Sequence, residues 1–234
     1  MESVLFRVVD ILNTHKISYW LTDGTLLGIV RENRILPWDL DIDIAVWKSE
    51  VQKIDVIKIF EDEGFKQMVM MPNMDCIHFM IDGTEVDIGF YSDKNSEVYI
   101  KWAYPSSKKL DRLTFLFINT IFLYSNKCIT SNYKKSFLNS IVQYLIELFS
   151  NLLTGKIKNR MYIYARNKYS YIGCTYPINL LDLKKIKFKD HEVIVPKDSD
   201  EYLRLTYGDN WRVPNKKYDM YEDTFNLQMY EEHE

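Results

Sequence analysis

Hydrophobic residues at the start of the chain follow the spacing of a helix, with apolar side chains three and four positions apart between residues 2 and 15. Residues 17–21 then form a short apolar run, which we interpret as a buried strand. The pair Asp23-Gly24 is a turn signal, and residues 25–32 predict a short helix that begins at this turn. The chain therefore opens with a helix, a strand, a turn and a second helix.

Strict alternation of polar and apolar residues replaces this spacing at residues 41–46 and predicts a strand with one buried face. The four residues from Ser49 to Gln52 have the form of a capping box, so we expect a helix that begins there and ends at Gly64. Residues 65–70 favour a further strand. This order of elements is typical of an α/β core.

A β-hairpin is predicted in the next part of the chain. The apolar run 78–81 is followed by Asp82-Gly83 and then by a second run, residues 84–90. An Asp-Gly loop between apolar runs favours a type I′ turn, which joins two antiparallel strands directly. Residues 98–102 favour one more strand.

The pattern changes at about residue 105 to long helical stretches. We therefore divide the chain into an α/β core, residues 1–104, and a mainly helical appendage, residues 105–234. Near the end, a helix is expected from about Ser199, with Gly208 as its stop. The predicted fold class is α+β, a small mixed sheet with helices packed on it, followed by a mainly helical C-terminal part.

The composition is that of a globular protein with a sizeable core, since 47% of the 234 residues are hydrophobic and 27% are charged. The formal net charge is −3, whereas proteins that hold a nucleic-acid backbone are usually basic, so we expect no nucleic-acid partner. The three cysteines, Cys76, Cys128 and Cys174, are widely spaced, which indicates reduced thiols and argues against a disulfide framework or a zinc site. We expect a cytoplasmic protein, because the N-terminus lacks the basic and apolar regions of a signal peptide.

Two apolar segments raise the question of a membrane. They are residues 113–124 and 137–153; the second is interrupted by polar residues, and both are flanked by lysine and arginine. Neither reaches the roughly 18 uninterrupted apolar residues of a membrane span. Two interpretations stay open: core helices with basic ends, or a peripheral contact with a membrane or a lipid acceptor.

Two carboxylates stand out in the alternating strand. Asp41 and Asp43 project from one face, while Ile42 and Ile44 enter the core on the other. Like charges a few ångströms apart repel by about 1 kcal/mol in water and about 4 kcal/mol near a protein surface. A divalent cation removes this penalty, and oxygen ligands suit Mg²⁺ or Mn²⁺. We therefore expect Asp41 and Asp43 to be metal ligands.

The hairpin supplies a third carboxylate, since Glu85 and Asp87 share one face of its second strand. If that strand lies beside residues 41–46, Asp87 completes a site of three carboxylates. Mg²⁺ held by a few carboxylates and by substrate phosphates is the usual arrangement for phosphoryl transfer. Asp39 belongs to the same face only if the first strand begins that early.

A phosphate site is indicated by Gly24 and Thr25, which stand between a strand and the start of a helix. Backbone N–H groups at such a helix N-terminus favour phosphate oxygens. The hydroxyl of Thr25 adds another donor.

The string GTLLGIVRENRILPWDLDIDI resembles the LicD/fukutin family, which has the nucleotidyltransferase fold. The resemblance is close over residues 17–46 and looser over residues 78–90 and 195–211. It implies a Mg²⁺-dependent phosphotransferase. Such an enzyme moves a phospho-alditol or phosphocholine type of group from a CDP-activated donor to a hydroxyl of a glycan or glycolipid.

The resemblance also implies roles for particular residues. Asp41, Asp43 and Asp87 take the metal-binding and catalytic positions, with Asp87 as the candidate base. The positions expected to bind donor phosphate are Gly24, Thr25, Arg31 and, as a second candidate, Arg34. One departure is Asp23, which stands where family members usually have a small residue. An acid beside a phosphate loop puts the identity of the donor in question.

The C-terminal tail, residues 190–214, is expected to return to the active site. There Tyr207 and Trp211 either stack on a nucleobase or pack the site, because aromatic faces bind bases without needing a particular one. His78, at the start of the hairpin, is a candidate for contact with donor phosphate or acceptor.

Two alternatives to this function remain open. The first is a metal-dependent nucleotidyltransferase, or an Asp-x-Asp glycosyltransferase, that uses a nucleotide-activated donor. The second is a non-catalytic binding protein on the same fold, which predicts lost acids, whereas Asp41, Asp43 and Asp87 are all present. The motif itself does not distinguish an enzyme that releases the nucleotide from one that leaves it on the product.

Overall fold

The structure, a computed structural model, describes residues 1–68, 75–104, 170–218 and 223–230, and in addition positions 148, 149, 152–157, 160, 161 and 164. Its main helices and strands are α1 (Glu2–Thr14), β1 (Tyr19–Leu21), α2 (Asp23–Glu32), β2 (Asp41–Trp47), α3 (Lys53–Asp62), β3 (Lys66–Met68), β4 (Cys76–Ile81), β5 (Thr84–Lys94), β6 (Glu97–Tyr104), β7 (Ser170–Pro177), η1 (Ile178–Leu181), β8 (Leu183–Phe188), β9 (His191–Pro196), α7 (Ser199–Tyr207) and β10 (Leu227–Tyr230).

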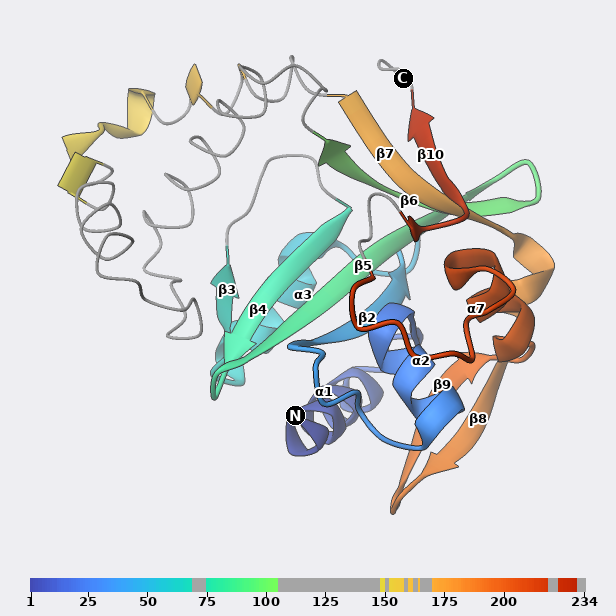
Figure 1. Cartoon of the computed structure of the whole chain (residues 1–234). Coiled ribbons are helices and arrows are strands. Elements are labelled where there is room, and N and C mark those ends of the chain that lie inside the picture. Colours follow the sequence, from blue (N-terminus) through green and yellow to red (C-terminus); the bar gives the residue numbers. More distant parts are fainter. Residues whose placement is uncertain are drawn as a thin grey trace.

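One mixed sheet organises the described part of the chain (Figure 1). Its main path is β1-β2-β5-β6-β7-β10, while β4 pairs with β5 and β3 pairs with β4. Strands β2 and β5 run parallel, and the other pairings are antiparallel. A separate hairpin of β8 and β9 lies against β1. The predicted α+β class, with a mixed sheet and helices packed on it, is confirmed.

The centre of the core is the apolar face of β2 and β5. Ile42, Ile44, Val86 and Ile88 are each at most 1% exposed. Fully burying an aliphatic side chain stabilises the fold by roughly 1.5–3 kcal/mol, so a slip of one residue in either strand is strongly disfavoured. Because side chains alternate along a strand, this burial also fixes the polar residues between them on the opposite face.

The predicted hairpin is confirmed as β4 and β5. Asp82 and Gly83 both have positive φ, at 49° and 77°, as a type I′ turn requires, and Ile81 pairs with Thr84 across it. The first strand extends back to Cys76, two residues before the expected start of the run.

Helices α2 and α7 confirm two further predictions. Helix α2 begins two residues earlier than expected, at Asp23. Its C-cap residue, Asn33, has a left-handed backbone conformation with a φ of 51°. Helix α7 begins at Ser199, where the side chain of Asp198 accepts a hydrogen bond from the Glu201 N–H at 3.1 Å. Gly208 follows it with a φ of 80°, which is a conformation that glycine adopts without strain.

The capping box predicted at Ser49 does not form. The N–H groups of Glu50 and Val51 donate to the carbonyl of Trp47 at 3.1 and 3.3 Å, so the chain makes a turn at the end of β2. Helix α3 then starts at Lys53, and its N-cap, Gln52, makes no capping bond with its side chain. The turn forms in place of the capping box because its two N–H groups bond to the last residue of β2.

The helical character expected after residue 105 does not hold over residues 170–196, which form β7, β8 and β9. Two features weaken their strand signal. β7 contains Gly173, where an added Cβ would lie 1.8 Å from the Ile100 carbonyl oxygen, and β8 carries exposed lysines. Residues 105–147, where long helices were expected, lie outside the described residues.

Candidate functional site

A cavity of about 1150 Å³ lies where β2, β4 and β5 meet the start of α2 and the segment that follows α7. The sequence-predicted site residues in its lining are Gly24, Arg31, Asp41, Asp43, His78, Asp87, Tyr207 and Trp211. Thr25 and Arg34 are not part of the lining. The fold thus gathers residues from widely separated parts of the sequence around one space.

The carboxylates of β2 and β5 lie side by side, as predicted. In the parallel pairing, Asp43 is opposite Asp87 and Asp41 is opposite Glu85. Oxygen atoms of Asp39, Asp41 and Asp43 lie within 4.8 Å of one another, and we call these three residues the acidic cluster. Asp39 precedes β2, so it joins the cluster from the loop before the strand.

Burial and mutual repulsion raise the pKa values of Asp43, Asp39 and the neighbouring Asp23. Burial, followed by the charges of Asp41 and Asp23, raises the pKa of Asp43 well above its usual value. Burial and then the hydrogen bond and charge of Asp41 raise the pKa of Asp39 to about 8. Burial raises the pKa of Asp23 to about 6, and the charges of Asp41 and Asp87 add to this. Oxygen ligands that are crowded and short of positive charge fit a hard divalent cation.

The start of α2 holds Asp43 in place. The backbone N–H of Thr25 donates to Asp43 Oδ2 at 3.1 Å, and the Asp43 N–H donates to Thr25 Oγ1 at 2.8 Å. Thr25 is fully buried, and its N–H and hydroxyl bond to Asp43, while its contact with donor phosphate stays a prediction. An added Cβ at Gly24 would lie 2.0 Å from Asp39 Oδ2, so glycine is needed there to admit the Asp39 carboxylate.

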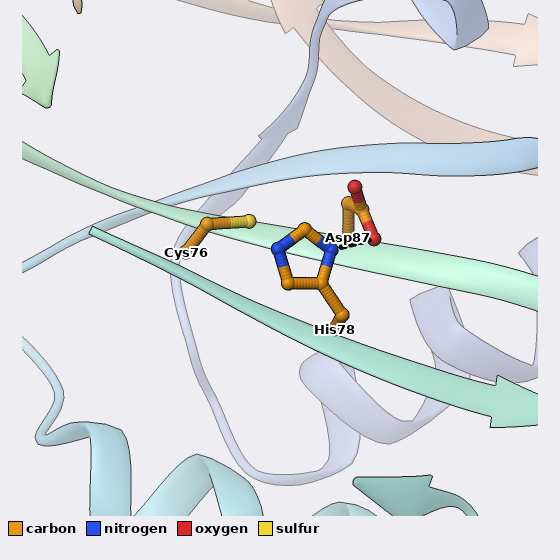
Figure 2. Close-up of side chains that lie close together, drawn as sticks. All are labelled: Cys76, His78 and Asp87. Atoms are coloured by element: carbon orange, nitrogen blue, oxygen red, sulfur yellow. Dashed lines mark hydrogen bonds and ion pairs between the residues drawn. The ribbon is translucent and has the colours of Figure 1, made fainter. Parts of the chain in front are cut away.

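Asp87 has a partner on the neighbouring strand. His78 and Asp87 are opposite each other in the β4–β5 pairing, and His78 Nδ1 lies 2.6 Å from Asp87 Oδ1 (Figure 2). Cys76 lies on the same face of β4, and ligand atoms of Cys76, His78 and Asp87 fall within 4.8 Å of one another. Burial raises the pKa of Asp87, and the His78 ring opposes this rise. Asp87 thus lies between the acidic cluster, where it is opposite Asp43, and the side chains of Cys76 and His78.

The two candidate arginines differ in position. The Arg31 side chain is 7% exposed, and its Nη1 donates to the backbone carbonyl of Trp211 at 3.2 Å. The Arg34 side chain is 53% exposed. Both guanidinium groups pair with Glu32, at 2.8 and 2.6 Å, so this carboxylate fixes them relative to each other. Only Arg31 lines the cavity.

Residues of the C-terminal segment line the same cavity. Trp211 is 6% exposed, and the ring of Tyr207 lies 4.9 Å from that of Tyr218. Both candidate aromatic residues are therefore packed by the protein as well as lining the cavity.

Several residues in the lining were not predicted as functional. Asp23 takes a φ of 43°, which is uncommon for a residue with a side chain, and the hydroxyl of Thr22 donates to its carboxylate at 3.2 Å. The Lys216 ammonium lies 5.1 Å from the centre of the Trp38 ring at the cavity. The sequence offers a signal for Trp38, which precedes the acids directly. It offers none for Lys216, which no motif connects to them.

No helix among the described residues is long and apolar enough to cross a membrane. Most of the two apolar segments, 113–124 and 137–153, lies outside the described residues.

Comparison with known proteins confirms the resemblance to the LicD/fukutin family. Residues 16–115 match the family described as LicD/FKTN/FKRP, nucleotidyltransferase domain. The chain is 31% identical over 64 residues to the ribitol 5-phosphate transferase FKRP of Homo sapiens, covering 25% of this chain and 13% of that protein. It is 22% identical over 237 residues to the ribitol-5-phosphate transferase FKTN of Homo sapiens, covering 97% of this chain and 38% of that protein.

A bacterial relative matches a shorter stretch. The lipopolysaccharide cholinephosphotransferase LicD of Haemophilus influenzae is 46% identical over 43 residues, covering 18% of this chain and 16% of that protein. The chain therefore spans less than half the length of each of these three relatives.

Proposed function

We propose that this chain, whose residues 16–115 match the LicD/FKTN/FKRP nucleotidyltransferase domain, is a phosphotransferase of the LicD/fukutin type. Its reaction moves a phospho-alditol or phosphocholine type of group from a CDP-activated donor to a hydroxyl of a glycan or glycolipid. The observation that carries this proposal is the convergence of Asp41, Asp43 and Asp87 on one face of two parallel strands, at a cavity large enough for a nucleotide. The relatives are named as transferases of ribitol 5-phosphate and of phosphocholine, which supports the same class of reaction.

The acids supply the residues for a Mg²⁺ or Mn²⁺ site. Asp41 and Asp43 would hold the cation, with Asp87 beside Asp43 as the third ligand. When bound, the cation would neutralise charge on the diphosphate of the donor. Asp43 is already oriented by Thr25 at the N-terminus of α2, so its carboxylate needs little rearrangement to bind.

Other residues bind the donor and prepare the acceptor. Arg31 lies in the cavity wall, where its guanidinium would contact donor phosphate, and Tyr207 and Trp211 would pack the nucleobase. Asp87 would take the proton from the acceptor hydroxyl through a carboxylate oxygen that the cation leaves free, because it lies in the cavity and its pKa is raised by burial. His78, hydrogen-bonded to it, would orient its carboxylate.

Nucleotidyl transfer is the second candidate, because the matching family domain is described as a nucleotidyltransferase domain. The two reactions differ in the phosphorus that is attacked. Phosphotransfer from a CDP donor releases CMP, whereas nucleotidyl transfer from a nucleoside triphosphate releases pyrophosphate and leaves the nucleotide on the product. The released product therefore identifies the reaction.

The test uses the full chain with CDP-ribitol, CDP-choline, UDP-sugars or nucleoside triphosphates, each with Mg²⁺ or with EDTA. We expect Mg²⁺-dependent release of CMP from a CDP donor, and stabilisation against thermal unfolding by the same donor. Release of pyrophosphate alone would support nucleotidyl transfer. Release of UDP from a UDP-sugar alone would support a glycosyltransferase. Mg²⁺-independent binding without any product would indicate a binding protein.

A further inference from the structure

A group of a thiol, an imidazole and a carboxylate lies beside the acidic cluster (Figure 2). Cys76 and His78 are two residues apart on β4, so both side chains lie on one face of the strand. Across the pairing, His78 is opposite Asp87 and Cys76 is opposite Gly89. The side chains of Ile100 and Tyr91 pack against Gly89, and both Cys76 and His78 line the cavity.

The hydrogen bond to Asp87 determines which nitrogen of His78 is free. The hydrogen bond of Nδ1 to Asp87 Oδ1, at 2.6 Å, keeps a proton on Nδ1. Burial lowers the pKa of His78, but the charges of Cys76 and Asp87 outweigh this and raise it well above its usual value, so Nε2 is the nitrogen that gives up its proton when an ion binds. Nε2 is buried and has no hydrogen-bond partner among the described residues. A buried polar atom without a partner destabilises the folded state, so its position needs an explanation.

A metal ion would supply the missing partner of Nε2. Histidines that bind metals almost always donate their other N–H to a carboxylate or carbonyl, which fixes the tautomer and the ring. His78 and Asp87 have this arrangement before any ion is bound. The Cys76 thiol lies within 4.8 Å of the pair, and the sulfur and nitrogen ligands of one tetrahedral Zn²⁺ are about 3.6 Å apart, so a small adjustment brings both onto one ion.

We propose that Cys76 Sγ and His78 Nε2 bind a thiophilic divalent cation of the Zn²⁺ type, with Asp87 as the residue that positions the His78 ring. The remaining coordination positions face the cavity. This site differs in kind from the acidic cluster, because sulfur and nitrogen ligands select Zn²⁺-like ions and carboxylates select Mg²⁺. The proposal does not depend on the proposed function, since it concerns a second ion and different ligand atoms.

The absence of paired cysteines does not argue against this site, because only one of its direct ligands is sulfur. Burial raises the pKa of the Cys76 thiol, so the free protein keeps it protonated. Binding of the ion therefore forms one bond to Cys76 Sγ and one to His78 Nε2, and it releases the thiol proton and the Nε2 proton to solvent. In the absence of metal, the Cys76 thiol donates a weak hydrogen bond to the backbone carbonyl of Ile77 at 3.9 Å.

The test uses Co²⁺ as a probe, because a thiolate ligand gives Co²⁺ an intense near-ultraviolet charge-transfer band that oxygen and nitrogen ligands do not give. The parent variant is Cys128→Ser/Cys174→Ser, which leaves Cys76 as the only thiol. We expect this variant to develop the band at one Co²⁺ per chain, and Zn²⁺ to remove it by displacement. The matched variant that also carries Cys76→Ser should lose the band entirely.

Two further variants examine the other residues. His78→Gln should weaken Co²⁺ binding at least tenfold. Asp87→Asn, which keeps both direct ligands of the Co²⁺ ion and removes the carboxylate that positions His78, should weaken Co²⁺ binding by about 10–100-fold. Millimolar Mg²⁺ should leave the band in place, since it prefers the acidic cluster. Circular dichroism of each variant verifies that the fold is intact.

Two results would overturn the proposal. One is a folded parent variant without the band at saturating Co²⁺, which would leave Cys76 as an ordinary buried thiol. The other is a band that persists after Cys76→Ser. Neither result affects the assay for CMP release, so the two proposals stand or fall separately.

Discussion

Two neighbouring groups in the cavity, the acidic cluster and the pair of His78 and Asp87, differ in whether the protein itself balances their negative charge. Among the residues that the structure describes, none of the three acids of the acidic cluster is ion-paired with lysine or arginine. By contrast, Asp87 lies 2.6 Å from the imidazole of His78. The first group is short of positive charge until a cation arrives from outside. The second has a partner within the protein and keeps its geometry without a ligand.

The difference follows from the side chains that strands β2 and β4 contribute to the cavity. Strand β2 brings like charges together, which only an ion or a proton makes favourable. Strand β4 supplies a side chain that satisfies β5 directly. Substitutions in the acidic cluster should therefore act on ligand binding and turnover, whereas substitutions in its supports should act on stability as well.

The largest effect is expected from Asp43→Asn, which removes one ligand charge and keeps the size of the side chain. Because it lies between Thr25 and Asp87, turnover should fall by two to three orders of magnitude, on the order of 10²–10³-fold, as for other groups that stabilise charge in a transition state. CMP release from the CDP donor measures this. Asp62→Asn, the same change at an exposed position of α3, is the control and should retain full turnover. Full activity in Asp43→Asn would disprove its role in the site.

The second prediction concerns Thr25, which positions Asp43 but is not expected to bind the ion. Thr25→Val keeps the size of the side chain but leaves the Asp43 N–H without its acceptor, so the free energy of unfolding should fall by about 1–3 kcal/mol. Thr25→Ser keeps the hydroxyl and should lose less than about 1 kcal/mol, the value of one buried methyl group. Urea unfolding without Mg²⁺ measures both. An equal loss in the two variants would mean that the hydroxyl is not what supports Asp43.

The site was predictable where local pattern and geometry agree. Asp41, Asp43 and Asp87 follow from period-two alternation, an Asp-Gly turn and a burial pattern that fixes the register. The role of Thr25 was not predictable, since it depends on how closely the N-terminus of α2 approaches β2. Cys76 was missed for a local reason: the expected strand began at His78, two residues too late.

In the fold, too, the features with local sequence signals were predictable and those that depend on distant contacts were not. The hairpin and α7 carry strong local signals, an Asp-Gly turn in one and an N-cap with a terminal glycine in the other. The addition of β7 and β10 to the sheet depends on pairing between distant segments, which no local pattern records. The approach of Lys216 to Trp38 is set by the path of the chain after α7 and is equally invisible to local rules.

A third prediction concerns the basic side of the cavity. Arg31→Ala should raise the KM for the CDP donor about tenfold, equivalent to about 1.4 kcal/mol, because its guanidinium lies in the cavity wall. Arg34→Ala removes the same charge three positions away on an exposed side chain and should change KM less than about twofold, since exposed ion pairs contribute little. Steady-state kinetics with the donor varied measures both. Similar effects in the two variants would mean that general charge, and not contact in the cavity, binds the donor.

The smallest effect is a dependence of stability on pH that the raised pKa values of Asp39 and Asp23 should produce. Asp39 has a pKa of about 8 and Asp23 of about 6 in the folded chain, against about 3.9 for an unfolded aspartate. The folded state therefore binds more protons than the unfolded state above pH 4. The stability that these protons provide is complete below the unfolded pKa and is lost as pH rises through 6 and then 8.

Without metal, the free energy of unfolding should consequently fall between pH 6 and pH 8, and the melting temperature should fall with it. The fall in free energy should be less than the 1.36 kcal/mol per pH unit of one fully linked proton, because these groups are partly exposed. Mg²⁺ should flatten the curve by stabilising the ionised carboxylates at the upper end, where its affinity is greatest. Asp39→Asn should flatten it without Mg²⁺, since an amide neither titrates nor repels. Differential scanning fluorimetry with EDTA or Mg²⁺ measures all three curves. If the metal-free protein instead became more stable from pH 6 to pH 8, the carboxylates would already be neutralised within the protein, and the contrast between β2 and β4 would be lost.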